Sequence, residues 1–159
     1  RLMKITLLAI GKTDNKELDK LIGQYTARIG HYLPFELKII LDVKRSGKTT
    51  EESQKLAEGK EILSELAPTD KLILLDERGK SFSSREFASF LEGKMLQSER
   101  RLVFVIGGPY GFSPEVYARA NEQLSLSKMT FSHQMVRLFI TEQIYRAMTI
   151  LRGEPYHHD

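Results

Sequence analysis

The chain has 159 residues, no cysteine, and a net charge of +3 that results from 24 basic and 21 acidic side chains. This length predicts a single domain, spanning residues 1–159, with a hydrophobic core of its own. The lack of cysteine excludes disulfide bonds, thiolate zinc sites and a cysteine nucleophile, and it fits a reducing compartment. The small positive charge is compatible with a polyanionic partner but does not by itself indicate nucleic acid.

No apolar run in the sequence approaches the length of a membrane-spanning helix, which is about 20 residues. The apolar stretch Leu2–Ile10 is interrupted by Lys4 and Thr6, so we expect neither a transmembrane helix nor a signal peptide. We therefore expect a soluble, cytoplasmic protein without a membrane partner.

Strands and helices are predicted to alternate along the chain, because short β-rich runs alternate with segments of helical period. The expected strands are Met3–Ile10, Phe35–Val43, Lys71–Asp76, Leu102–Ile106 and Leu124–Lys128. The expected helices begin at Asp14, with capping-box spacing to Glu17, after Thr50, at Ser83, at Ser113 and at Ser132, and the last one spans His133–Leu151. This order predicts an α/β fold, with a mostly parallel sheet and helices on both faces.

The stretch Leu102–Phe112 runs from five apolar residues into a loop that contains three glycines. Gly107, Gly108 and Gly111 lack a Cβ atom, so a bound molecule can approach their backbone closely. In open α/β sheets, ligands bind at the carboxyl ends of the strands, which is where this loop lies. It resembles a dinucleotide fingerprint, but its spacing is wrong and it follows the fourth strand and not the first, so we expect no nicotinamide cofactor. We take this loop as the centre of the site, and a glycine-rich turn without a ligand is the alternative.

Two further loops leave predicted strands and should meet the glycine loop at the same edge of the sheet. They are Leu75–Gly79 and Leu126–Phe131. Exposed amides and carbonyls of such loops can read the edge of a purine, and Leu75 and Met129 can cover its faces. Each stretch by itself is also compatible with an ordinary loop, and together they suggest a cleft for a purine nucleoside.

The tail Pro155–Asp159 is rich in imidazole and phenol groups. Adjacent histidines such as His157 and His158 point in different directions and lack the spacing of a metal pair on a helix, so we expect no metal site. Terminal residues are often frayed, but a tail tethered to a long helix can also supply acid–base groups to a site beside it. The basic loop Lys44–Lys48 is interpreted as a solvated connection in preference to an RNA contact.

Four segments of the chain match a known family. They are Ile106–Pro109, Leu126–Phe131 followed by His133, Val136–Ala147 and Arg152–His157. They closely resemble the ribosomal large subunit methyltransferase H family, which belongs to the SPOUT class of knotted methyltransferases, and the resemblance extends along the chain from Met3. It implies methylation of N3 of a pseudouridine in large-subunit ribosomal RNA, with S-adenosyl-L-methionine as the cofactor. It also implies a homodimer and a deep trefoil knot in the carboxyl-terminal region, which no periodicity could reveal.

The resemblance also assigns site residues. The cofactor would be bound by Leu75, Gly107, Leu126, Ser127, Lys128, Met129, Thr130 and Phe131, which lie in the same three loops. The catalytic residues would be Tyr156, His157 and His158, with His157 as the candidate base or proton relay and Tyr156 as a positioning residue. At position 158 the family carries Arg or Lys, so a permanent cation is replaced here by a side chain that titrates near neutrality. The alternative is a noncatalytic RNA-binding or nucleoside-sensing module that uses the same cleft.

The last predicted helix provides an independent argument for a homodimer. Leu138, Tyr145 and Met148 fall outside its main apolar stripe and would form a second strip, with a polar border of Arg137, Thr141 and Arg152. An exposed apolar strip of this kind usually marks a partner surface, and two-fold pairing of identical subunits is the commonest way to cover it. The alternative is that these residues pack under the tail or under the basic loop.

Overall fold

The computed structural model describes residues 2–42 and 50–159, and its centre is a five-stranded parallel sheet with the order β2-β1-β4-β3-β5. The strands are β1 (Lys4–Ile10), β2 (Phe35–Ile40), β3 (Lys71–Ser81), β4 (Arg101–Ile106) and β5 (Glu122–Ser125). The helices are α1 (Lys16–Ile29), α2 (Glu51–Ser64), α3 (Ser84–Leu96), α4 (Pro114–Arg119) and α5 (His133–Leu151). The predicted α/β fold with a parallel sheet is confirmed, and the basic loop Lys44–Lys48 lies outside the described residues.

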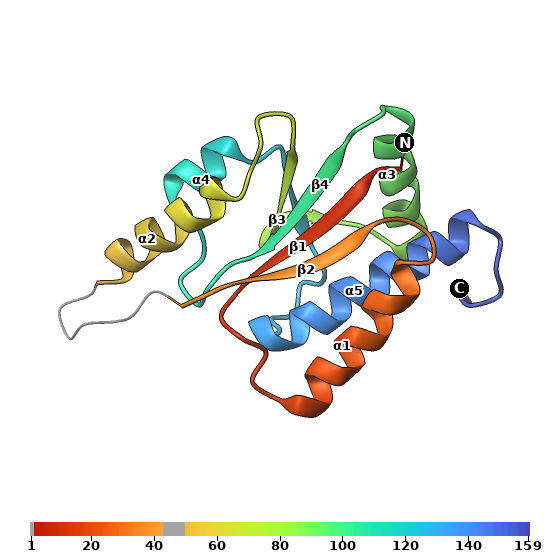
Figure 1. Ribbon diagram of the computed structural model, residues 1–159, viewed down its shortest axis with the longest axis horizontal. Coiled ribbons are helices and arrows are strands. Elements are labelled where there is room, and N and C mark those ends of the chain that lie inside the picture. Colours follow the sequence, from red (N-terminus) through yellow and green to blue (C-terminus); the bar gives the residue numbers. More distant parts are fainter. Residues whose placement is uncertain (1, 43–49) are drawn as a thin grey trace.

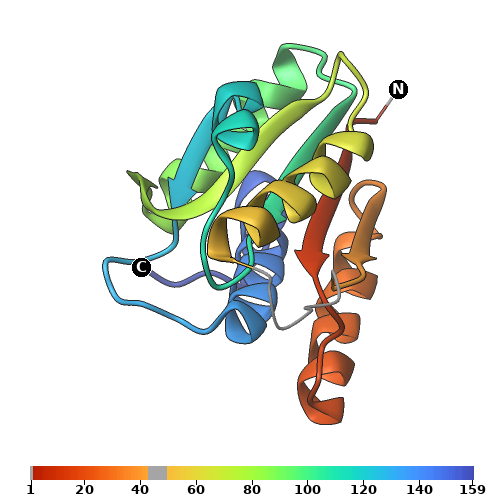
Figure 2. The same ribbon diagram turned by 90° about the vertical axis from the view of Figure 1, so that its left-hand side faces the viewer.

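Helices cover both faces of the sheet, as Figure 1 shows. Successive side chains of a strand point to opposite faces, so Ile5 and Leu7 of β1 join one core while Leu8 and Ile10 join the other. The first core contains residues of α1, α3 and α5, and the second contains residues of α2 and α4. Figure 2 shows these layers from the side, with α2 in the foreground. The molecule is thus a three-layer α/β structure.

Short polar side chains cap the helices where the sequence predicted, with one exception. Ser83, Ser113 and Ser132 accept hydrogen bonds from backbone N–H groups in the first turns of α3, α4 and α5. The last helix has the predicted bounds. The predicted capping residue Asp14 of α1 is wrong, because Asn15 accepts the capping hydrogen bond and the helix begins after it.

Strand β3 extends beyond its predicted end and continues to Ser81 through an irregularity. Its pairing with β5 shifts there, so that both Leu75 and Lys80 are paired with Leu124. Gly79 makes this approach possible, since a Cβ atom on it would lie 2.5 Å from the backbone nitrogen of Leu124. Both ends of β5 accordingly lie earlier in the chain than predicted, and β2 is shorter than predicted.

Helix α5 is buried on several sides because it packs against the sheet, α1 and α3. Met148 is 4% exposed and belongs to the core, and Tyr145 packs against the rings of Tyr25 and Tyr32. The prediction of a second, exposed apolar strip is therefore wrong for Met148 and Tyr145, which pack within the chain. The third residue of that strip, Leu138, lines a cavity described below.

The buried Arg137 ties α5 to the end of β1. Its guanidinium is fully buried and donates to the carbonyl of Ile10 at 2.8 Å and to the hydroxyl of Thr13 at 3.0 Å. Burial lowers the pKa of Arg137, while the carboxylates of Asp14 and Asp42 act in the opposite direction. The prediction that this side chain lies on an exposed polar border is wrong, because the carbonyl of Ile10 and the hydroxyl of Thr13 accept hydrogen bonds from its two terminal nitrogens inside the protein, while its buried Nε has no partner among the described residues.

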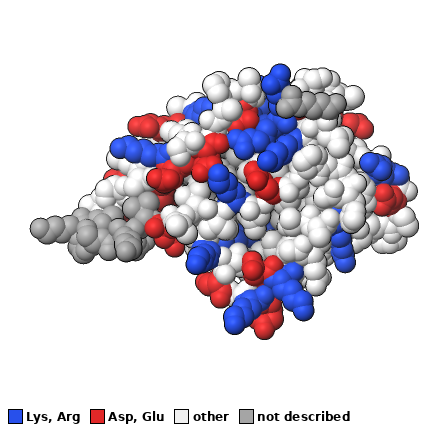
Figure 3. Space-filling view, in the orientation of Figure 1, with Lys and Arg blue, Asp and Glu red and all other residues white. Residues whose placement is uncertain are grey.

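Positive and negative side chains lie side by side on the face of the molecule shown in Figure 3. This mixture agrees with the small net charge of the sequence. Within the described residues, no helix combines the length and the apolar character that crossing a membrane requires.

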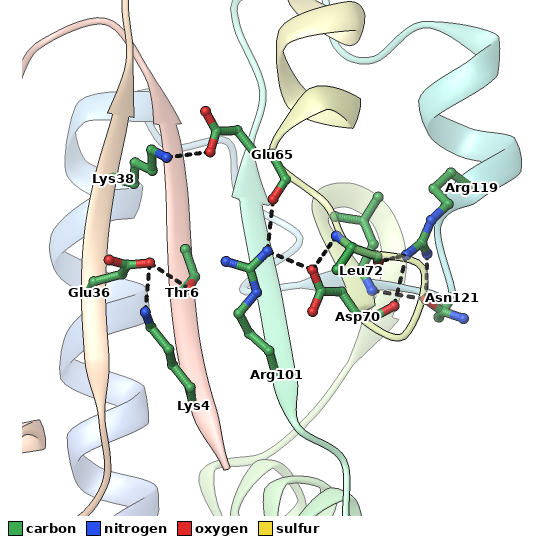
Figure 4. Close-up of polar contacts among 11 residues, drawn as sticks. Lys4, Thr6, Glu36, Lys38, Glu65, Asp70, Leu72, Arg101, Arg119 and Asn121 are labelled. Atoms are coloured by element: carbon green, nitrogen blue, oxygen red, sulfur yellow. Dashed lines mark hydrogen bonds and ion pairs between the residues drawn. The ribbon is translucent and has the colours of Figure 1, made fainter.

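A polar network joins the starts of β3 and β4 (Figure 4). Arg101 donates to the carboxylate of Asp70 at 2.6 Å, and the backbone N–H of Ala67 donates to the same carboxylate at 2.7 Å. Arg119 donates to the backbone carbonyl of Asp70 at 2.9 Å, and Asp70 is only 5% exposed. Burial alone would raise the pKa of Asp70, but the hydrogen bonds from Arg101 and Ala67 outweigh it and hold the pKa below its usual value.

We predict that Asp70→Asn destabilises the protein by about 2 kcal/mol at neutral pH, the size of a hydrogen bond to a charged group. Because the folded-state pKa is lowered, the carboxylate stabilises the fold above the unfolded-state pKa of about 3.9. This contribution disappears as the pH falls through the folded-state pKa. Urea unfolding of both proteins at neutral and acidic pH measures the difference.

The matched control is Glu52→Gln, which removes an exposed ion pair with Lys55. It should cost less than about 0.5 kcal/mol. An equal loss of stability in the two variants would contradict the role of Asp70 in the network.

Candidate functional site

The irregular part of β3, the loop after β4 and the loop after β5 meet at one cavity of about 430 Å³. Of the eight residues predicted to bind the cofactor, those that line it are Leu75, Gly107, Leu126, Ser127, Met129, Thr130 and Phe131. Lys128 does not line the cavity. The three stretches that the sequence predicted to converge do so, but the prediction that Leu75–Gly79 is a loop after the third strand is wrong, because these residues lie within β3.

The cavity combines apolar walls with backbone and hydroxyl groups. Leu75 of β3 and Leu126, directly after β5, line it. The hydroxyl of Ser125 donates to the carbonyl of Ser127 at 2.8 Å, and the N–H of Met129 donates to the hydroxyl of Ser127 at 2.9 Å, which shapes the loop after β5. The volume lies within the range of about 300–1,000 Å³ typical of small-molecule pockets. The cavity therefore fits a ligand of nucleoside size.

The glycine loop after β4 has little room for side chains. A Cβ atom on Gly107 would lie 3.0 Å from the ring of Phe112, and one on Gly108 would lie 2.7 Å from a carboxylate oxygen of the buried Glu58. Gly111 has a φ angle of 81°, in the left-handed region that favours glycine. The shape of the loop thus depends on its glycines.

Asp76, Arg78 and Tyr117 form a network on one wall of the cavity, and the sequence analysis did not assign them to the site. Arg78 donates to the hydroxyl of Tyr117 at 2.6 Å, and that hydroxyl donates to the carboxylate of Asp76. Burial would raise the pKa of Asp76, but the hydrogen bonds from Tyr117 and Arg78 outweigh it and lower the pKa. Asp76 and Arg78 lie in a stretch that the sequence had indicated and that belongs to β3, whereas no sequence signal connects Tyr117 of α4 with that stretch.

The predicted catalytic tail does not line this cavity and lies against α5 instead. The hydroxyl of Tyr156 donates to the carboxylate of Glu142 at 3.1 Å and lies 3.4 Å from the hydroxyl of Tyr25. The rings of Tyr156 and Tyr145 have centroids 4.7 Å apart, and the guanidinium of Arg146 lies 4.7 Å from the Tyr156 centroid. Burial, the Tyr25 hydroxyl and the Glu142 carboxylate all raise the pKa of Tyr156, so its hydroxyl is protonated at neutral pH.

His157 is held at both of its ring nitrogens. Arg146 contacts Nδ1 at 3.1 Å, and Nε2 lies 2.8 Å from a carboxylate oxygen of Asp159. Arg85 of α3 binds the same carboxylate at 2.8 and 2.9 Å. The side chain of His157 is 12% exposed, whereas His158 is an exposed residue. The two histidines of the tail thus lie in different environments.

A second cavity, of about 570 Å³, shares Leu124–Leu126 and Phe131 with the first. Tyr25 and Glu142, which contact Tyr156, also line it. The tail and the three stretches therefore border neighbouring cavities. In the part of the chain that the structure describes, no cluster of His, Cys, Asp and Glu side chains could hold a metal ion.

Residues 3–157 match the family model described as "Predicted SPOUT methyltransferase". The chain belongs to the SPOUT methyltransferases. Its relative in Porphyromonas gingivalis, named ribosomal RNA large subunit methyltransferase H, is 57% identical over 157 residues, which cover 99% of this chain and 100% of the relative. Proteins of the same name from Christiangramia forsetii and Flavobacterium psychrophilum are 57% and 58% identical over 156 residues, which cover 98% of this chain and 99% of each relative. The predicted family is confirmed, and it implies a trefoil knot at the carboxyl-terminal end of this SPOUT methyltransferase.

We predict that Gly108→Ala destabilises the protein by about 1–3 kcal/mol, the usual cost of overpacking, because the new methyl group would clash with Glu58. In a Glu58→Ala background the same change should cost much less, since the clash is removed. Chemical unfolding of the wild type, both single variants and the double variant gives the coupling free energy.

Gly93→Ala in α3 serves as the control, because a Cβ atom there meets nothing within 4 Å. It should leave stability unchanged or raise it slightly. An equal cost of Gly108→Ala in the two backgrounds would show that Glu58 does not constrain the glycine loop.

Proposed function

We propose that the chain transfers a methyl group from S-adenosyl-L-methionine to N3 of a pseudouridine in large-subunit ribosomal RNA. The observation that supports this proposal is the convergence of the irregular part of β3 and the loops after β4 and β5 on one cavity in a SPOUT methyltransferase. The names of the relatives support the choice of ribosomal RNA as the substrate. We further propose that one domain, residues 1–159, performs the reaction in the cytoplasm, where ribosomes are found.

Leu75 and Leu126 are suited to cover the faces of the adenine, and the backbone at Gly107 to approach the cofactor closely. Ser127–Phe131 would complete the binding loop. The bound cofactor supplies a methyl group that its positive sulfur makes electrophilic. The protein must orient N3 towards that methyl group and favour loss of the N3 proton, and we assign this part to Tyr156–His158.

We propose a homodimer in which the tail of one subunit reaches the cofactor cavity of the other. Tyr156 and His157 do not line this cavity in their own chain. The neighbouring cavity exposes apolar surface on Leu21 and Phe131, which are 38% and 36% exposed, and Leu138 lines it as well. Exposed apolar surface of this kind marks a partner surface, and two-fold pairing of identical subunits would bring a second tail to it.

The direct test is transfer of labelled methyl groups to assembled ribosomes and to free ribosomal RNA, followed by identification of the modified nucleoside. We expect N3-methylated pseudouridine with the wild type. We predict that Gly107→Val weakens cofactor binding at least about tenfold, or 1.4 kcal/mol, in calorimetry, because its branched side chain presses on Phe112 and fills space beside the backbone.

Gly93→Val is the control for this measurement, since it adds the same side chain where there is open space. Normal cofactor affinity in a folded Gly107→Val protein would contradict the placement of the cofactor. The absence of methyl transfer by a folded wild type that binds the cofactor would contradict the proposed function.

For the homodimer, we predict that Leu21→Glu yields monomers in sedimentation and lowers methyl transfer at least about 100-fold, because a desolvated charge at the interface costs several kcal/mol. Leu56→Glu is the matched control, since Leu56 is 44% exposed on α2, on the other face of the sheet. It should remain dimeric and active. A monomeric wild type that methylates ribosomes at micromolar concentration would contradict this prediction.

A further inference from the structure

The contacts of His157 determine which of its nitrogens carries the proton. A guanidinium has only N–H groups and cannot accept a hydrogen bond, so the contact from Arg146 at 3.1 Å requires a lone pair on Nδ1. The proton of the neutral ring is then on Nε2, which lies 2.8 Å from Asp159 and donates to its carboxylate. Both contacts agree on one form of the side chain, the neutral imidazole with its proton on Nε2.

A positively charged His157 does not fit this arrangement. Its Nδ1–H would point at the guanidinium of Arg146, so the contact with Asp159 is a hydrogen bond of a neutral ring and not an ion pair. The hydrogen bond from Arg85, and next that of His157, lower the pKa of Asp159, which keeps it an acceptor. The titratable and charged groups of this network come from α1, α3, α5 and the tail and are Tyr25, Arg85, Glu142, Arg146, Tyr156 and Asp159.

Arg146 is itself fixed in place. Glu142, one turn earlier in α5, accepts from its Nε at 3.1 Å, and the ring of Tyr156 lies against the guanidinium. The side chain of Arg146 is only 22% exposed. An ordered and permanently charged donor therefore faces Nδ1 of His157, and the partner on Nδ1 decides the tautomer.

We propose that His157 acts on the pseudouridine ring as a neutral hydrogen-bond donor through Nε2, and that Arg146 is the positioning residue that fixes this tautomer. The acceptor is a carbonyl oxygen beside N3, which takes the place of Asp159 when RNA is bound. Asp159 suits such an exchange because its side chain is 67% exposed. This inference rests on the proposed function, and it replaces the role of base that the sequence indicated for His157.

A donor at this position accelerates methyl transfer because loss of the N3 proton spreads negative charge onto the oxygens on both sides of N3. During methyl transfer, the N3 proton passes to solvent water. The N3 electron pair forms the bond to the methyl carbon, and the electron pair of the broken S–C bond stays on sulfur. His157 neither gains nor loses a proton.

Two amide substitutions of His157 separate a donor from a base. Glutamine places an N–H near the position of Nε2 and asparagine near that of Nδ1, and neither amide takes up a proton at neutral pH. We predict that His157→Gln stays within about tenfold of wild-type methyl transfer, whereas His157→Asn and His157→Ala lose about 100-fold or more, the usual cost of removing such a donor. Cofactor affinity should be unchanged in all three. A His157→Gln protein that binds the cofactor and is as inactive as His157→Ala would overturn the donor role.

Nitrogen NMR of the His157 ring reports the tautomer without turnover. We expect the proton on Nε2 in the wild type and in the control Arg85→Met, which removes only a contact of Asp159. Arg146→Met should give mixed tautomers, because methionine leaves Nδ1 without its N–H donor. A wild-type ring with its proton on Nδ1, or an unchanged tautomer in Arg146→Met, would overturn the positioning role.

Failure of the proposed function has a different appearance. It would show as no methyl transfer by the wild type, whereas failure of this inference shows, with an active wild type, as a His157→Gln protein that is as inactive as His157→Ala or as a proton on the wrong nitrogen of His157.

Discussion

The burial of α5 between the sheet, α1 and α3 is the constraint on which both parts of the site depend. The beginning of this helix carries His133 and Val136, which line the cavity beside the glycine loop, and its middle carries Glu142 and Arg146, which hold the tail. Arg137 is bonded to β1 inside the protein, so a shift of the helix would leave a buried cation without its acceptors. One rigid helix therefore sets the distance between this cavity and the tail.

The sequence predicted those parts of the fold that neighbouring residues determine. The strand Leu102–Ile106 is covered on both faces and appears as a continuous apolar run. The caps Ser83 and Ser132 directly precede their helices, and Gly111 stands where the backbone needs a positive φ angle. The place of the glycine loop and of the loop after β5 at the carboxyl ends of their strands followed from the same local reasoning together with the alternation of elements.

The parts that the sequence did not predict depend on contacts between distant segments. Asp76 and Tyr117 are 41 positions apart, and their hydrogen bond exists only because α4 returns to the irregular part of β3. The helical period alone places Arg137 on the surface of the helix. Its acceptor Ile10 in β1 lies 127 positions away, so no sequence pattern indicated the buried contact. Met148 was misplaced for a related reason, since a helical period shows one apolar face but not how many neighbours the helix has.

The wall between the two cavities has a thermodynamic consequence. Leu124–Leu126 and Phe131 border both of them, so a molecule that moves this wall on entering one cavity changes the shape of the other. Such coupling is reciprocal. If a molecule in the first cavity changes the affinity of the second cavity by some factor, a molecule in the second cavity changes the affinity of the first by the same factor. If subunits pair at the second cavity, Leu124–Leu126 and Phe131 couple pairing to cofactor binding. The cofactor affinity then depends on the protein concentration, and the dissociation constant of the dimer depends on the cofactor concentration.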